Sequence, residues 1–250
     1  GTFEVFDSLE GEFGGTGGFI PVDERALAGG TLLGLAMFVA LFLGVVLAVF
    51  LTHGAIRGDA ERGLLQPLVV RPVGRTTLLV GRLLAAAAVA GAYVILVFLA
   101  AALITWMAGD FTPGSLVVPA LGLALGVVSV VAVSLLGSSL LGTTANGIAV
   151  FMVFGAGLAA GLLGQIGEGL DVEGLKTASS IISWAVPFEA LYQSGLDALT
   201  SDLTGLTQVV VQLGPFGGAA DVSPLIWPWA VAWTAAVVAL AAWVFSRRDL

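Results

Sequence analysis

The sequence "VVPALGLALGVVSVVAVSLLGSSLLGTTANGIAVFMVFGAGLAAGLLG", residues 117–164, belongs to a run without charged side chains that extends from Phe111 to Gly167. A helix needs about 20 mostly apolar residues to cross the hydrocarbon core of a membrane, so this run is too long for one crossing. The segment "LGTTANG" at 141–147 interrupts it with small polar residues and two glycines, as a tight turn does. We therefore predict two spans here, about 116–142 and 146–165.

The composition of the whole chain fits this interpretation. Hydrophobic residues make up 58% and charged residues 10% of the 250 residues, and the mean hydropathy is +1.05. A soluble domain carries roughly 25% charged residues. The sequence also lacks the alternating segments of about 10 residues that mark an outer-membrane barrel. We predict an all-α, polytopic membrane protein with five spans, of which the other three are about 29–52, 78–107 and 225–246.

The positive charge is concentrated between the first two predicted spans. Five of the nine Lys and Arg residues lie between positions 56 and 82. Cytoplasmic loops carry an excess of Lys and Arg, so we place the loop 53–77 inside the cell. Alternation of the spans then places 1–28 and 166–224 outside and the C-terminus inside. The ending "FSRRDL" at 245–250 was not used for this assignment, and its two arginines, Arg247 and Arg248, agree with a cytoplasmic C-terminus.

The acidic residues outnumber the basic ones, and the net charge is -8. On the predicted topology most of the acidic side chains face outward, which gives the outer surface a negative field. This excess of acids, with a single lysine, suggests a salt-loving organism. Solubility or activity that does not depend on molar salt would contradict that hypothesis.

Ionisable residues are almost absent from the predicted spans. Such residues inside a membrane usually mark proton relays, ion paths or catalysis. Their scarcity argues against a proton-coupled secondary transporter and against an intramembrane hydrolase, which needs a nucleophile and a base or a metal cluster. The chain has no cysteine, and its one histidine, His53, cannot form a metal site alone. We predict no catalytic residue, cofactor or nucleic-acid partner for this chain.

The segment "GLDVEGLKT" at 169–177 comes close to a phosphate-binding loop. That motif requires adjacent Gly and Lys, as in G-x-x-x-x-G-K-[ST]. Leu175 separates the two here, and the segment falls on the predicted outer side. We therefore predict that a partner chain, rather than this one, binds any ATP that drives the protein.

The basic loop has an internal pattern of its own. Its charged start is followed by apolar residues at helical spacing, so we expect a short amphipathic helix, broken at Pro67, on the inner membrane surface. Two interpretations follow. The loop is either a positive anchor of the kind that membrane proteins commonly have, or a compact knob that docks into a groove on a partner protein.

Three motifs, in this order, resemble the permeases of type-2 ABC transporters. They are E-R-G-x-L-x-x-L-x-x-R-P-V-x-R at 61–75 followed by G-R at 81–82, "ISWAVPFEALYQSGL" at 182–196, and "FSRRDL" at 245–250. The resemblance covers about residues 29–250, which we take as the permease domain. It implies six spans in each permease subunit. Since five are visible and residues 1–28 fall outside, we expect a first span upstream of this sequence.

The resemblance also implies the partners of the chain. These are cytoplasmic ATPase subunits, a second permease subunit of identical or different sequence, and membrane lipids. A coupling helix in the loop 53–77 would contact the ATPase. The residues that we predict to make this contact are Asp59, Glu61, Arg62, Leu65, Arg71 and Arg75.

The long outer segment 166–224 contains an amphipathic pattern. Apolar residues from Phe188 to Leu199 repeat at helical spacing, with Glu189 and Gln193 between them. The predicted helix either packs on the spans or forms an outer gate over an exit path. The gate residues in the second interpretation are Phe188, Glu189, Leu191 and Tyr192.

Glycine pairs spaced four residues apart mark three of the spans, at Gly30/Gly34, Gly122/Gly126 and Gly157/Gly161. This spacing lets helices approach closely. The pairs serve packing within the chain or a contact between two chains.

The sequence therefore predicts the membrane subunit of an ATP-driven exporter in the plasma membrane. The alternative is a membrane scaffold or assembly factor whose basic loop binds anionic lipid. The cargo is not encoded in any motif of the sequence.

Overall fold

The structure is a computed structural model that describes residues 24–53, 74–109, 111–201 and 223–247. The described residues form helices and connecting turns without strands, which confirms the all-α prediction. The helices are α2 (Glu24–Thr52), α5 (Arg75–Gly109), α6 (Val117–Leu140), α7 (Thr143–Gly169), α8 (Glu173–Ala185), α9 (Phe188–Thr200) and α11 (Ile226–Ser246).

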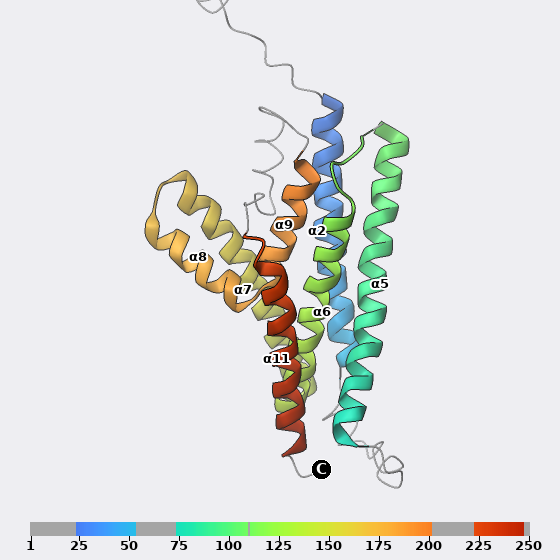
Figure 1. The fold of residues 1–250 in the computed structure, drawn as a ribbon, viewed down its shortest axis with the longest axis vertical. Coiled ribbons are helices and arrows are strands. Elements are labelled where there is room, and N and C mark those ends of the chain that lie inside the picture. Colours follow the sequence, from blue (N-terminus) through green and yellow to red (C-terminus); the bar gives the residue numbers. More distant parts are fainter. Residues whose placement is uncertain (1–23, 54–73, 110, 202–222, 248–250) are drawn as a thin grey trace, which may run out of the picture.

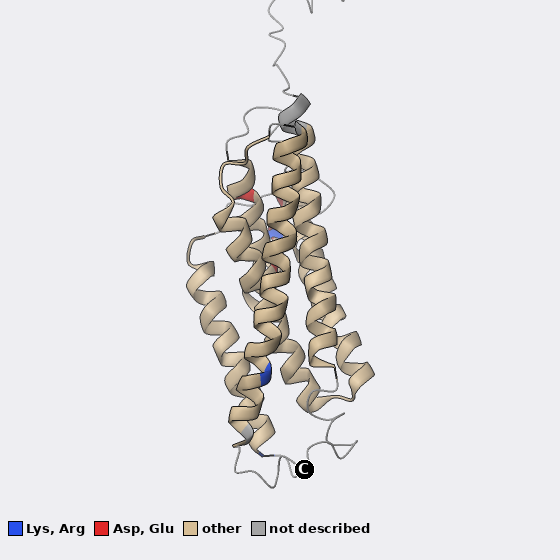
Figure 2. Cartoon of the chain, turned by 90° about the vertical axis from the view of Figure 1, so that its right-hand side faces the viewer, with Lys and Arg blue, Asp and Glu red and all other residues tan. Residues whose placement is uncertain are grey.

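Five of these helices are long and apolar enough to cross a membrane, as the sequence predicted. The two short helices, α8 and α9, lie between the fourth and fifth of them in the chain. Figure 2 shows how few charged residues the described helices carry. The five candidate spans are Ala28–Thr52, Thr76–Ala108, Val117–Leu140, Thr143–Gly169 and Ile226–Ser246.

The spans form an elongated bundle (Figure 1). The end of α2, the start of α5, the turn between α6 and α7 and the end of α11 meet at the lower end of this view. The connection from α5 to α6 lies at the upper end. We use "lower end" and "upper end" in this sense below.

Helix α6 is the centre of the bundle. It contacts α2, α5, α7, α9 and α11, and more of its spanning segment is buried than in any other span described. The core combines Leu41 of α2, Phe98 of α5 and Leu123 of α6, each with none of its surface exposed. Large apolar side chains such as Phe50 and Leu96 point outward instead, 70% and 67% exposed. Outward apolar side chains suit contact with lipid tails.

The turn between α6 and α7 is tighter than the predicted segment 141–147. Helix α6 ends at Leu140 and α7 begins at Thr143, so Asn146 lies inside α7. Its side chain explains the early start, because Nδ2 donates to the Ser134 carbonyl at 3.0 Å across the turn. The Ser134 hydroxyl also shares a 2.5 Å hydrogen bond with Thr52 of α2. Asn146 therefore joins α7 to α6, and Ser134 in turn joins α6 to α2.

Candidate functional site

Helix α9 is a short helix held inside the upper half of the bundle beside α2 and α6 (Figure 1). It begins directly after Pro187, whose fixed φ suits a helix start. The predicted apolar stripe is buried, but the polar residues between its members are buried as well. Glu189 is 1% and Gln193 7% exposed. The residues of α9 that are buried are Phe188, Glu189, Ala190, Leu191, Tyr192, Gln193, Gly195, Leu196, Leu199 and Thr200.

Glycines of α6 and α7 form the cradle that admits α9. A Cβ at Gly122 would lie 2.8 Å from the Leu191 carbonyl oxygen, and one at Gly157 would lie 2.5 Å from Cζ of Phe188. A Cβ at Gly161 would overlap the Glu189 carboxyl. Contacts of this kind are closer than real Cβ atoms make, so a larger residue at these positions would force α9 or its side chains to shift, and at Gly122 it would meet the backbone of α9 itself. The pairs Gly122/Gly126 and Gly157/Gly161 therefore serve packing within the chain.

Glycines also allow close contact on the side of α9 that faces α2. Gly195 is a glycine of α9 itself, and a Cβ there would lie 2.7 Å from Cε of Met37 and 3.0 Å from Cα of Pro119. A Cβ at Gly34 of α2 would lie 3.3 Å from a methyl group of Leu196. Helix α9 is thus enclosed by α2, α6 and α7.

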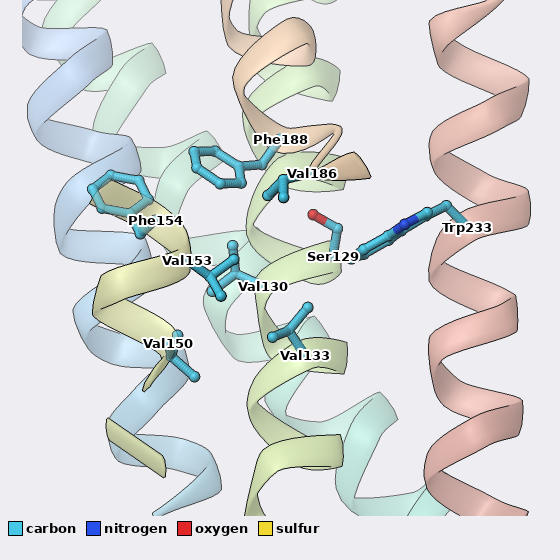
Figure 3. A pocket seen from close by; sticks show the side chains of 9 residues that line it. All are labelled: Ser129, Val130, Val133, Val150, Val153, Phe154, Val186, Phe188 and Trp233. Carbon is cyan, nitrogen blue, oxygen red and sulfur yellow. The ribbon is translucent and has the colours of Figure 1, made fainter. Parts of the chain in front are cut away.

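Phe188 closes the space beneath α9. Its ring stacks on Phe154 of α7, with 5.1 Å between the ring centroids and 23° between the planes. Figure 3 shows these rings above a small apolar space between α6, α7 and α11, with Trp233 on its far side. The space measures about 10 Å³, barely the volume that one water molecule needs. The floor beneath α9 is therefore closed and apolar.

Glu189 is the buried acid of this region. Its Oε1 accepts a 3.1 Å hydrogen bond from Nε2 of Gln193, one turn along α9. Its Oε2 is buried and has no partner among the described residues. Burial raises the pKa of Glu189 to about 8, and the bond from Gln193 opposes this shift. Burial, with the nearby Glu189, also raises the pKa of the Tyr192 phenol.

A polar cavity of about 310 Å³ lies beside this acid, between the α7–α8 hairpin and the helices α9 and α11. Gln193 forms part of its wall, so the hydrogen-bonded pair on α9 reaches the cavity. Next to Gly164 in the sequence, Gln165 of α7 has a buried Nε2 without a partner among the described residues. The cavity is lined by Gly164, Glu168, Lys176, Ser179, Ser180, Ser183, Trp184, Ala190, Gln193, Ser223 and Ile226.

The near-motif at 169–177 forms the turn from α7 into α8. Asp171 adopts a φ of 53°, in the left-handed region. Nζ of Lys176 binds Asp171 at 2.6 Å and Glu173 at 3.1 Å. The hydrogen bond from Lys176 to Asp171 raises the pKa of the ammonium group. Farther along α8, the Trp184 carbonyl accepts a 2.8 Å bond from Nε1 of Trp229, which ties the hairpin to α11.

The structure describes the predicted gate residues but not the side chains of the predicted coupling residues. The four predicted gate residues, Phe188, Glu189, Leu191 and Tyr192, come together in the glycine cradle, each at most 1% exposed. The sequence did not reveal the cavity residues of α7 and α8, because isolated serines and glutamines carry no periodic signal. Five predicted coupling residues lie outside the described residues, as does the side chain of Arg75. Those five are Asp59, Glu61, Arg62, Leu65 and Arg71.

Comparison with known proteins identifies one family. A family model described as "ABC-2 family transporter protein" matches residues 15–250. No curated protein and no solved structure matches the chain.

Proposed function

The chain belongs to the ABC-2 transporter family, and we propose that it works as an exporter subunit driven through the loop 53–77 by a separate cytoplasmic ATPase. Membership in this family, with the five candidate spans, makes the chain a multi-pass membrane protein and a permease component of an ABC transporter. It is a transmembrane rather than a catalytic part. We propose three further points: that transport is outward, that the loop 53–77 couples the chain to its ATPase, and that α9 forms an outer gate.

The position of the helix ends that flank the basic loop supports the coupling proposal. The last described residue before the basic loop, His53, and the first one after it, Gly74, lie at the lower end of the bundle. The α6–α7 turn and the end of α11 lie at that end too. Placing the loop in the cytoplasm therefore also places the end of α11 there, on the same side as the proposed ATPase.

The enclosure of α9 is the single observation that carries the gate proposal. A 13-residue helix, not long enough to span, occupies the upper half of the bundle and contacts four spans, α2, α6, α7 and α11. In this position it blocks any path that runs between α2, α6 and α7 toward the upper end. We propose that ATP binding by the partner moves these spans apart from α9 and opens that path outward.

Co-purification with an ATPase tests the coupling. We would express this chain with the ABC ATPase encoded nearest to it, purify through a tag on this chain, and measure the bound ATPase and its ATP hydrolysis. We expect a stoichiometric complex that Glu61→Ala and Arg71→Ala weaken or uncouple. Charged contacts at an interface also make assembly sensitive to salt. The matched control is Glu173→Ala, which removes an exposed carboxylate at the opposite end.

Labelling of introduced cysteines tests the orientation. The natural chain has no cysteine, so each substitution gives a single reactive thiol. In intact cells, a membrane-impermeant maleimide should label Thr112→Cys, in the exposed α5–α6 connection at the upper end, and spare Thr143→Cys until the membrane is opened. The reverse pattern would overturn the proposed sidedness. A chain that purifies without ATPase and whose loop variants behave like wild type would point to the lipid-binding scaffold instead.

A further inference from the structure

We propose that α9 is a proton-linked gate: Glu189 is a neutral acid while α9 sits in its glycine cradle, and it releases its proton into the polar cavity when α9 leaves the cradle. The inference adds a regulatory role to the gate proposed above and rests on that gate. The bound proton and its link to the movement of α9 belong to this chain alone, so both can be measured without an ATPase.

The surroundings of Glu189 do not suit a charged carboxylate. The residue is 1% exposed, and Oε1 accepts one 3.1 Å hydrogen bond, from Nε2 of Gln193. Its Oε2 is buried without a partner among the described residues. A buried carboxylate needs a counter-ion or several hydrogen bonds, and a carboxyl group that lacks them takes up a proton instead. The seated form of Glu189 is therefore the neutral acid.

The described groups around this acid add no positive charge to it. Helices α6 and α11 and residues 26–52 of α2 carry no charged side chain. The ionisable side chains on the other elements packed here are Glu168 of α7, Asp171 of the turn, Glu173 and Lys176 of α8, and Tyr192 and Asp197 of α9.

These groups favour the neutral form of Glu189. The cation among them, Lys176, is held by Asp171 at 2.6 Å and by Glu173 at 3.1 Å. The Tyr192 phenol is neutral, because burial raises its pKa. Glu168 lines the cavity and leaves its wall net negative. A negative wall disfavours a further anion beside it.

The polar cavity can supply the water that takes the proton. Glu189 is not part of the lining, but its neighbour in the chain, Ala190, and its hydrogen-bond partner, Gln193, are. The cavity measures about 310 Å³, which is room for several water molecules of about 30 Å³ each. The acid is thus one side chain away from a polar, negatively charged space at the upper end.

The glycine cradle links the proton to the position of α9. A Cβ at Gly161 would overlap the Glu189 carboxyl and would lie 2.8 Å from Nε2 of Gln193, so α7 covers this pair without an intervening side chain. When α9 and α7 part, water solvates the carboxyl group. Its O–H bond breaks, the proton passes to a water molecule of the cavity, and the electron pair stays on the carboxylate. The proton must return before α9 is seated again.

The pH therefore sets how often α9 leaves the cradle. The pKa of Glu189 is about 8 in the seated form, against 4.5 for an ordinary glutamate, and water restores the ordinary value in the open form. Between these values each opening releases one proton, so the open population rises about tenfold per pH unit. It is constant below about pH 4.5 and above about pH 8. A low pH at the upper end holds the gate closed.

Infrared spectroscopy of the full chain in lipid nanodiscs tests the proton. At about pH 6 exposed Asp and Glu side chains are ionised, so the C=O stretch of a protonated carboxylic acid comes from buried acids. We expect this band in the wild type, its loss as the pH rises through about 8, and its absence from Glu189→Gln. Glu168→Gln is the matched control, because it makes the same change in the cavity wall and should keep the band.

Hydrogen exchange in the same samples tests the link to movement. After correction for the intrinsic rate, the backbone amides of α9 should exchange about tenfold faster per unit between about pH 5.5 and 7.5. Glu189→Gln should abolish this rise, and Glu168→Gln should retain it. Helix α11 has no ionisable side chain. Its amides are the internal control, and they also show whether each variant keeps its bundle.

Each other outcome overturns the proposal. A band that is missing at about pH 6, or that survives in Glu189→Gln, would place the proton elsewhere. Exchange in α9 that ignores pH, or that changes equally in α11, would separate the proton from any movement of α9. A rise that Glu168→Gln abolishes and Glu189→Gln retains would assign it to the cavity wall.

Failure of the gate itself gives a different result. The complex with the partner ATPase is compared with and without ATP at one pH, and we expect ATP to speed exchange in α9. If ATP leaves this exchange unchanged while the pH rise persists in the chain alone, the proton controls a movement that transport does not use.

Discussion

Helices α8 and α9 are neighbours in the sequence, each has 13 residues, and each has an apolar and a polar side, yet they end in different environments. Helix α8 has no buried residue and pairs mainly with α7. Ten of the 13 residues of helix α9 are buried, including the acid Glu189. The contrast teaches that an amphipathic pattern does not set the depth of a helix. The number of helices that surround it does: α9 lies among α2, α6, α7 and α11, whereas α8 packs mainly on α7, although glycines of α7 meet both short helices.

The largest effect should come from filling the cradle. Gly157→Leu places a side chain where Phe188 lies, and overpacking of a closed site should cost about 3 kcal/mol. Gly155→Leu adds the same side chain to the same helix, where a Cβ meets nothing within 4 Å. It should stay within about 1 kcal/mol of wild type, with a gain in helix propensity. Thermal unfolding in detergent measures both, and equal losses would mean that α9 is not held by the cradle.

A disulfide should fix α9 against α6 and test whether α9 must move for the complex to work. A Cβ at Gly126 lies 3.6 Å from that of Phe188, within the range of about 3.5–4.5 Å for disulfides. In the assembled complex, oxidised Gly126→Cys with Phe188→Cys should reduce ATP hydrolysis to the level of the ATPase without this chain. Reduction should restore it to the level of the single variants. Unchanged hydrolysis in the oxidised form would show that α9 does not move during transport.

The buried acid of α9 should make stability depend on pH. The pKa of Glu189 is about 8 in the folded chain against 4.5 for an ordinary glutamate. Between these values the folded state holds a proton that the unfolded state releases, so stability is greatest below about pH 4.5 and falls as the pH rises through about 8. Glu189→Gln should flatten the profile, by a few kcal/mol at most across the window. Unfolding temperatures at about pH 5, 7 and 9 test this, and a parallel slope in the variant would assign the effect to another group.

The smallest effect should come from α8. Ile181 is 64% exposed, and Ile181→Ala should change stability by no more than about 0.5 kcal/mol. Leu191 of α9 is 0% exposed, and Leu191→Ala should cost at least about 2 kcal/mol. Thermal unfolding of the pair compares a removed aliphatic side chain in the two helices. A large loss at Ile181 would mean that α8 is covered by something beyond the described chain.

The stripe on α9 could be predicted because Phe188, Leu191 and Tyr192 repeat at helical spacing. The burial of Glu189 and Gln193 could not, since polar residues on one side of a helix normally indicate solvent. The signal that could have revealed it lies in another helix, α7. Gly161 makes room for Glu189 and Gln193, but pairing a glycine with a residue 28 positions away requires the fold.

The sequence by itself determined the membrane class and the number of visible spans, and it predicts the sidedness. Each of these depends on the length of an apolar run or on the charge at its ends, and such properties are local. The depth of α9, the polar cavity and the place of Asn146 depended on tertiary structure. They arise where side chains from separate helices meet: a missing Cβ on one helix makes room on another, and a buried amide finds its acceptor across a turn.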